Sequence, residues 1–511
     1  MGLWFYIIAS LCVYIFLLQA LLSVIRNKRL PPSPPTIPFL GNIFWLLKSS
    51  KNFADLEPVL RYLRSKHGNM VTIHIGSTPA IFITTHEAAH RALVKNGTLF
   101  AGRPWALPTT IVFFPNQHSV STSQYGPTWR LLRQNLMQII HPSRLQSYSH
   151  CRKSALGVLK NHILADIEMG SKSIAIHDHL VHSMFALLSY MCFGENFDET
   201  TIRSIQKVQH DVLHNFIRFN VLNFLPILSK IVFRKLWKEL LEIRQNQVDS
   251  LLPIIKARYE VTKNKFGDEE EEEGFIAYVD TLFDMKLPDS GRKLSNEEIV
   301  SLCSEFILAG TDTTATTLLW AMANLVKNQN IQEKLFCEIN QVMKAGEEIE
   351  EEHLKKMPYL KAVVLETIRR HPPGHFMLPR AVTQDTVMDG YHIPKDAIVN
   401  CLVAEIGWDP NVWEDPMEFK PERFSRKSQG EDGGFDLKGH SEIKMMPFGA
   451  GRRICPAISM ALLHIEYIVA NLIRDFKWTL QDGCDVDMSE KQAFTVVMNN
   501  PVKPCVSPRP L

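Results

Sequence analysis

The sequence lacks several features that would assign it to a class at once. No C-x-x-C occurs among its nine cysteines, which excludes zinc-ribbon and redox-pair motifs. Their odd number and wide spacing argue against a disulfide framework. Lys and Arg (56) barely exceed Asp and Glu (54), so a nucleic-acid-binding surface is not expected. No segment repeats with a period of about 20–50 residues, which argues against a solenoid.

One long charge-free run stands at the amino end. Residues 3–25 carry no charge, and as a helix they would reach about 34 Å, enough to cross a hydrocarbon core of about 30 Å. Arg26, Lys28 and Arg29 follow the run, which predicts that its carboxyl side stays in the cytosol. A cleaved signal peptide is the alternative, but its basic residues should precede a shorter apolar run. We therefore expect one transmembrane helix that is retained as an anchor.

The segment after the anchor is rich in proline, which favours an extended, semi-rigid chain. The expected organisation is an anchor with its basic stop over residues 1–29, a Pro-rich hinge over 30–50 and a single catalytic domain over 51–511. Asn96-Gly97-Thr98 is a glycosylation sequon. With the domain in the cytosol, Asn96 should stay unmodified.

Beyond residue 50 the pattern predicts a mainly α fold with small β-sheets. The β-branched runs 71–75 and 80–84 predict a hairpin, and a second pair of strands is expected near 386–401. Apolar residues at spacings of three and four predict the helices. These cover residues 128–140, 154–168, 236–257, 296–327, 330–344 and 358–370.

The helix expected over 296–327 has an unusual centre. Ser295 and Glu298 form a capping box at its start, and its length of about 45 Å would cross a whole domain. Residues 309–314 read Ala-Gly-Thr-Asp-Thr-Thr, which is poor helix material. Polar residues in the middle of a buried helix indicate a polar partner. The alternative is that Thr313 simply bonds back to the carbonyl one turn earlier, and the cluster alone does not decide.

A glycine-containing loop near the carboxyl end delivers one cysteine. Residues 447–457 read Pro-Phe-Gly-Ala-Gly-Arg-Arg-Ile-Cys-Pro-Ala, and a helix is expected from about 457 to 475. A thiolate at a helix amino terminus is stabilised by the helix dipole and by free amide groups. A dinucleotide-binding loop is excluded because Ile454 stands where the third glycine belongs.

This loop resembles the haem-binding loop of the cytochrome P450 family, F-x-x-G-x-R-x-C-x-G. Phe448, Gly451, Arg453 and Cys455 match the pattern, whereas Ala457 replaces its final glycine. Four further signatures of the family stand in the expected order. They are Trp129 and Arg133 (W-x-x-x-R), residues 309–314 (the oxygen-binding motif), Glu366 and Arg369 (E-x-x-R), and residues 421–424 (P-E-R-F, with Arg423).

The resemblance implies a role for each of these residues. Cys455 would be the axial thiolate ligand of the iron of haem b, and Phe448 of the same loop would also bind the haem. Asp312 and Thr313 would relay protons to dioxygen. The haem propionates would be bound by Trp129, Arg133, Arg380 and Arg453, with Arg380 at the start of a strand. A structural ion-pair cluster would consist of Glu366, Arg369 and Arg423.

The implied function is that of a plant microsomal haem-thiolate monooxygenase. It would insert one oxygen atom of O2 into a hydrophobic small molecule, with electrons from NADPH supplied by a membrane-bound NADPH-cytochrome P450 reductase at a surface that includes Arg130 and Arg452. The expected location is the endoplasmic reticulum membrane, with one span and no nucleic-acid partner. The alternatives are a haem-thiolate isomerase or dehydratase that needs no NADPH, and a non-enzymatic, membrane-tethered haem or ligand carrier.

The resemblance also places a substrate pocket near residues 104–125, 373–379 and 494–498. The centre of the long helix around Phe306 and Ala309 would also border it, and Phe113, Phe114, Phe376 and Met377 would make it apolar. Ordinary core packing is the alternative for each of these side chains.

Overall fold

The computed structural model describes residues 56–509 apart from 77, 224, 225, 266–274, 345, 426–434 and 482. It also describes residues 30–37, 40–42, 45, 46 and, singly, 10 and 14. The anchor expected over residues 3–25 therefore falls almost wholly outside the described residues. Within the described part of the chain, no helix is both long and apolar enough to span a membrane.

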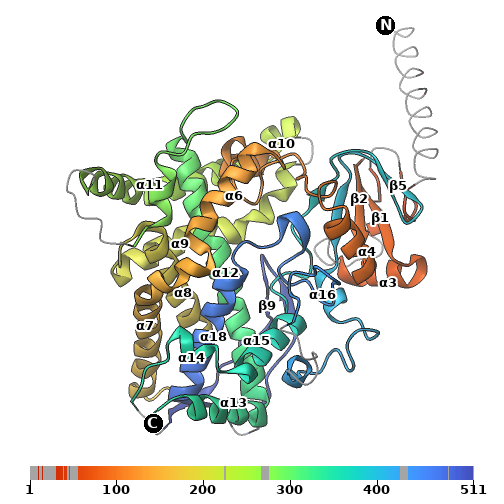
Figure 1. Cartoon of the computed structure of the whole chain (residues 1–511). Helices are drawn as coiled ribbons and strands as arrows, with labels where there is room; N and C mark the ends of the chain where they lie inside the picture. Colours follow the sequence, from red (N-terminus) through yellow and green to blue (C-terminus); the bar gives the residue numbers. More distant parts are fainter. Residues whose placement is uncertain are drawn as a thin grey trace. The chain divides into compact units, whose positions relative to one another are not determined.

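The chain divides into two compact units (Figure 1). A helical unit contains Trp105–Gly374, Asp415–Phe435 and Cys455–Leu511, and a smaller sheet unit contains Met1–Pro104, His375–Glu414 and Asp436–Ile454. The unit boundary thus passes between Ile454 and Cys455, inside the loop singled out by the sequence.

The helical unit is built around one long buried helix. α12 (Asn296–Lys327) begins at the predicted capping box, where the Glu298 amide donates to Ser295 Oγ at 3.3 Å and the Ser295 amide donates to Glu298 Oε2 at 2.8 Å. α8 and α18 pack along α12, which runs through the interior of this unit (Figure 1). The remaining helices are α5 (Pro108–Phe113), α6 (Pro127–Ile140), α7 (Ser149–Glu168), α8 (Ile176–Phe193), α9 (Glu199–Phe216), α10 (Pro226–Val232), α11 (Arg234–Lys265), α13 (Gln329–Val342), α14 (Glu351–Leu354), α15 (Pro358–Arg370) and α18 (Ile458–Asp475).

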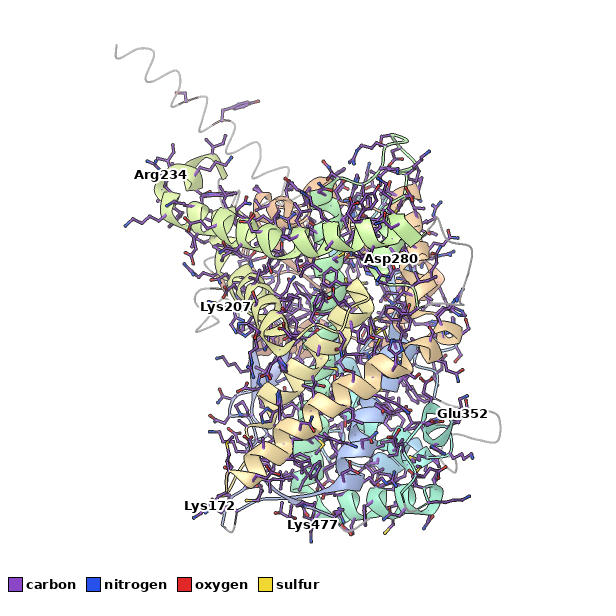
Figure 2. The ribbon with its side chains drawn as sticks, turned by 90° about the vertical axis from the view of Figure 1, so that its left-hand side faces the viewer. Lys172, Lys207, Arg234, Asp280, Glu352 and Lys477 are labelled. Atoms are coloured by element: carbon purple, nitrogen blue, oxygen red, sulfur yellow. The ribbon has the colours of Figure 1, made fainter. Side chains whose placement is uncertain are left out.

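Short helices and paired strands complete the helical unit. Figure 2 shows α11 extending from Arg234 toward Asp280, whose carboxylate accepts a hydrogen bond from Arg258 Nε at 2.8 Å. This pair ties α11 to the short helix η5. The other elements are η2 (Pro115–Gln117), η3 (Pro142–Tyr148), η4 (Arg218–Asn223), η5 (Tyr278–Leu282), η6 (Pro421–Phe424) and the antiparallel pairs β7 (Phe476–Thr479) with β10 (Cys505–Pro508) and β8 (Glu490–Gln492) with β9 (Val496–Met498).

The sheet unit contains one four-stranded sheet in the order β1-β2-β6-β3. β1 (Met70–Ile75) and β2 (Thr78–Ile83) form the predicted hairpin, with Met70 opposite Ile83. β2 pairs in parallel with β6 (Ile398–Cys401), which pairs antiparallel with β3 (Arg380–Ala381). The unit also contains α3 (Glu57–His67), α4 (His86–His90), η1 (Arg91–Lys95), the hairpin of β4 (Thr386–Met388) and β5 (Tyr391–Ile393), α16 (Val403–Gly407) and η7 (Gly451–Arg453).

The mainly α fold with small sheets is confirmed. Every helix predicted from apolar spacing is present, with ends that agree to within five residues except in α11, which ends at Lys265, eight residues beyond its predicted end. Two long helices, α8 and α9, are absent from the prediction. Most residues of α8 are buried, so its sequence shows no alternation between an apolar and a polar side from which a helix can be detected.

Candidate active site

The loop before Cys455 depends on glycine. Gly449 and Gly451 have φ of +70° and +69°, in the left-handed region that favours glycine. A Cβ on Gly451 would overlap the Leu93 carbonyl oxygen, whereas a Cβ on Gly449 would meet nothing within 4 Å. Gly451 is therefore required by both backbone conformation and close packing, and Gly449 by conformation alone.

Cys455 lies three residues before the first residue of α18. Burial raises the pKa of its thiol, while the Ala457 amide and the charge of Arg133 lower it. Both of the latter groups stabilise a thiolate. The sulfur is thus a soft ligand whose thiolate is favoured by one amide donor and one positive charge, against the effect of burial. Ala457 has φ of −98°, so this position does not need the glycine of the family pattern.

Arg133 and Trp129 lie one turn apart on α6. The guanidinium of Arg133 lies over the Trp129 ring, 5.5 Å from its centroid. Burial lowers the pKa of Arg133 and the neighbouring Cys455 raises it. The Trp129 Nε1–H donates to the Val120 carbonyl at 3.2 Å, so a propionate could use this donor only by competing with that carbonyl.

Two buried arginines of the sheet unit hold backbone carbonyls near the loop. Arg380, the first residue of β3, donates from Nη2 to Ala450 O at 3.3 Å. Arg453 donates from Nε to Ala101 O at 2.8 Å. Phe448 in the same loop is partly buried. Buried guanidinium groups are the donors that a buried carboxylate requires, so these side chains suit a group that carries propionates.

The centre of α12 is more exposed to solvent than the turns that follow it. Ala309 is exposed, and Asp312 and Thr313 are partly exposed. The residues that follow, 314–326, are all buried. Thr313 Oγ1 donates to Ala309 O at 2.7 Å. Thr313 therefore does bond to the carbonyl one turn earlier, which the sequence did not decide. Its side chain is also partly exposed.

Asp312 has a partner that the sequence did not indicate. Thr495, just before β9, donates its hydroxyl to Asp312 Oδ2 at 2.8 Å and lies 3.0 Å from the hydroxyl of Thr316. Burial raises the pKa of Asp312, and the Thr495 bond and the charges of His177, His210 and His214 lower it. A carboxyl group whose pKa is raised in this way holds a proton more readily than an exposed aspartate does, and a proton donor needs this property.

Glu366 joins two stretches of chain through one carboxylate. It accepts from Arg369 Nε at 2.7 Å, from Arg423 Nε at 3.3 Å and from the Lys420 amide at 2.8 Å. The side chains of Glu366 and Arg369 are fully buried. This cluster fastens the segment around η6 to α15 and offers no group to a substrate.

The expected substrate-pocket residues are divided between surface and core. Phe113 and Phe306 belong to the main apolar core, where Phe306 stacks on Tyr278 with ring centroids 4.9 Å apart. Phe494 is exposed. Phe113 and Phe306 therefore pack within the core of the helical unit.

An acid–alcohol pair at the centre of a long buried helix, together with a thiol just before the last helix, is what is expected of the haem-thiolate class. The cytochrome P450 family model matches residues 31–506, and this chain belongs to that family. It is 47% identical to Cytochrome P450 89A9 of Arabidopsis thaliana, over 99% of this chain and 98% of that protein. It is 30% identical to geraniol 8-hydroxylase of Catharanthus roseus, over 94% of each.

Solved structures agree with the fold. Retinoic acid-bound cyanobacterial CYP120A1 is similar with a TM-score of 0.75 and 22% identity, over 94% of this chain and 99% of that one. The chain is accordingly an oxidoreductase of the monooxygenase family. Membership implies haem with a cysteine thiolate ligand and a requirement for O2 and electrons.

Proposed function

We propose that the chain is a haem-thiolate monooxygenase that inserts one oxygen atom of O2 into a hydrophobic small molecule, using electrons from NADPH. The observation that carries this proposal is the position of Cys455, before α18, with the Ala457 amide and Arg133 both favouring its thiolate. Haem, when bound, supplies the redox chemistry that activates dioxygen.

The side chains of the protein would bind the haem and deliver protons. Cys455 would ligate the iron, and the guanidinium groups of Arg133, Arg380 and Arg453 would bind the propionates. On α12, Thr313 would offer its hydroxyl to dioxygen, and Asp312 would replace the proton that this hydroxyl gives up. Trp129 would join the propionate site by exchanging its Val120 partner.

The ligand assignment is tested by spectroscopy of purified holoprotein. Reduced wild type under carbon monoxide should give the long-wavelength absorption band typical of thiolate ligation, and Cys455→Ala should lose it. The matched control is Cys337→Ala, at an exposed cysteine of α13. Retention of the band in Cys455→Ala would refute the assignment.

The acid–alcohol pair favours oxygen activation over the two alternatives. An isomerase or dehydratase does not need external electrons, and a carrier does not turn over. Product formation should therefore require both NADPH and a reductase. Turnover without NADPH would identify an isomerase or dehydratase, and ligand binding without turnover would identify a carrier.

The proposed electron donor is a membrane-bound NADPH-cytochrome P450 reductase. Arg130 on α6 and Arg452 in η7 are both exposed and could contact an acidic partner. The double variant Arg130→Glu, Arg452→Glu should raise the KM for reductase while leaving the carbon monoxide band unchanged. Arg234→Glu, at the exposed start of α11, is the control. An unchanged KM in the double variant would exclude these contacts.

The proposed location is the endoplasmic reticulum membrane, with an anchor over residues 1–29 and the catalytic domain in the cytosol. Asn96 is exposed and would be reachable by glycosylation only on the luminal side. The full chain should fractionate with microsomes and be insensitive to endoglycosidase. A version in which a cleavable signal peptide replaces the anchor should be glycosylated at Asn96.

A further inference from the structure

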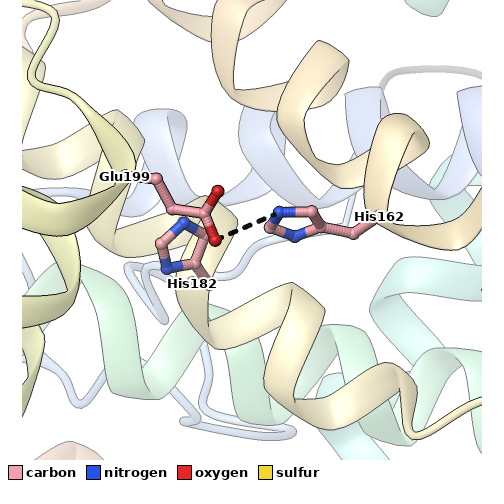
Figure 3. A group of neighbouring side chains, drawn as sticks. All are labelled: His162, His182 and Glu199. Atoms are coloured by element: carbon pink, nitrogen blue, oxygen red, sulfur yellow. Dashed lines mark ion pairs between the residues drawn. The ribbon is translucent and has the colours of Figure 1, made fainter. Parts of the chain in front are cut away.

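Three helices of the helical unit bring two histidines and a glutamate together, away from the residues of the proposed active site. His162 lies on α7, His182 on α8, and Glu199 is the first residue of α9 (Figure 3). One ligating atom from each lies within 4.8 Å of the other two. Figure 3 shows the three side chains directed toward one point between the helices.

His182 is held in a form that can ligate a metal ion. Its side chain is buried, and Nδ1 lies 3.2 Å from Gln206 Oε1. Because an amide oxygen only accepts, Nδ1 carries the hydrogen, which leaves the lone pair on Nε2. A histidine oriented through its second nitrogen in this way is typical of metal ligands.

His162 and Glu199 supply the other two donors on the solvent side. His162 Nε2 lies 3.7 Å from Glu199 Oε1, and the two rings of His162 and His182 have centroids 5.3 Å apart. The Glu199 side chain is 53% exposed, so it can rotate. The Asp198 cap, which accepts from the Thr201 amide at 2.7 Å, fixes the backbone beside it.

We propose that His162, His182 and Glu199 form a binding site for a divalent transition-metal ion, with Zn2+ as the probe. Two imidazole nitrogens and one carboxylate oxygen are ligands that Zn2+ prefers, and water would complete a tetrahedron. Ligands of a tetrahedral Zn2+ lie about 3.3 Å apart. The three donors therefore need to approach by at most about 1.5 Å, which side-chain rotation of Glu199 and His162 can supply.

One neighbour opposes the ion and gives the site a measurable signature. Arg203, one turn further along α9, donates from Nε to Glu199 Oε1 at 2.9 Å. Both side chains of this pair are more than half exposed, and exposed pairs at this spacing are weak. A metal ion would compete with Arg203 for the negative charge of Glu199, so removal of this arginine should strengthen binding.

The ion would join α7, α8 and α9 and would have a structural effect. Binding to the folded state alone raises the apparent stability by mass action. This inference does not depend on the proposed monooxygenase reaction, because none of the three ligands belongs to the proposed active site. Its test therefore reads metal binding and unfolding temperature rather than turnover.

The experiment titrates untagged, chelator-treated holoprotein with Zn2+ against a chromophoric chelator. Wild type should bind one equivalent at this site and gain thermal stability. His162→Gln and Glu199→Gln should each lose more than about tenfold in affinity, while Arg203→Gln should gain affinity. X-ray absorption should show only nitrogen and oxygen donors.

The control is a separate pair of histidines, both of which lie on α9. His210 and His214 stack with ring centroids 3.6 Å apart and could themselves bind a metal ion. His210→Gln should leave the affinity unchanged. The proposal is overturned if His162→Gln and Glu199→Gln bind as wild type does, if wild type binds no Zn2+, or if the affinity is lost in His210→Gln instead.

Discussion

Thr495 donates a hydrogen bond to Asp312 across 183 residues of sequence, at 2.8 Å. The contact connects the segment before β9 with the accessible centre of α12. It fixes the orientation of the one carboxyl group that the proposed reaction uses for proton delivery. Thr316 lies 3.0 Å from the same hydroxyl, so three side chains form a short polar chain.

Loss of this contact should change a pH profile. In Thr495→Val the carboxylate of Asp312 loses a donor that lowers its pKa, so the pKa of Asp312 rises further. Asp312 then remains protonated to higher pH, and the alkaline limb of product formation should move upward. Thr316→Val keeps the Thr495–Asp312 bond and is the control. An unmoved profile in Thr495→Val would contradict the proton-delivery role.

Thr313→Ala should separate electron use from product formation. The hydroxyl that would hand a proton to dioxygen is removed, so NADPH consumption should continue while product per NADPH falls about tenfold or more. The matched control is Thr317→Ala. Thr317 makes the same kind of bond to the carbonyl one turn earlier, at 2.8 Å, but its side chain is buried. Equal coupling in Thr313→Ala and wild type would refute the relay.

Glu366→Gln should destabilise the fold strongly. The substitution leaves the buried guanidinium of Arg369 without its charged partner, which costs about 3–5 kcal/mol of unfolding free energy. Chemical denaturation measures this loss. Glu422→Gln removes the exposed pair with Lys334 and should cost less than about 1 kcal/mol. Similar losses in the two variants would show that the Glu366 cluster contributes no more than a surface pair.

The two glycines of the cysteine loop should respond differently to alanine. Gly451→Ala places a methyl group on the Leu93 carbonyl and must displace the loop, whereas Gly449→Ala adds only backbone strain of about 1–2 kcal/mol. The fraction of protein with the thiolate carbon monoxide band should therefore fall far more in Gly451→Ala. Equal retention of haem in both variants would show that the close approach to Leu93 is dispensable.

Glu466 on α18 should make stability depend on pH. Burial raises its pKa to about 7 from the ordinary glutamate value of 4.5. Between these values the unfolded chain releases a proton that the folded chain keeps, so stability falls as pH rises and the penalty is complete above about pH 7. Glu466→Gln should therefore raise the unfolding free energy by about 1–3 kcal/mol at pH 8, with little change at pH 4. Equal gains at both pH values would contradict this assignment.

Local signals in the sequence were sufficient for much of the fold. The capping box at Ser295 and Glu298 marked the start of α12, because a cap depends on residues three positions apart. The hairpin of β1 and β2 followed from two β-branched runs and a glycine between them. α8 was not predicted because a helix that is buried on most sides carries no polar stripe.

Cys455, the Asp312–Thr313 pair and the E-x-x-R pair could be picked out from the amino-acid order alone, because each lies within one short segment. The distant groups that meet them are known only from the packed structure. Thr495 reaches Asp312, and His162, His182 and Glu199 converge, because helices and strands far apart in sequence pack together. Such contacts depend on the burial of apolar side chains over the whole unit, which no local pattern specifies.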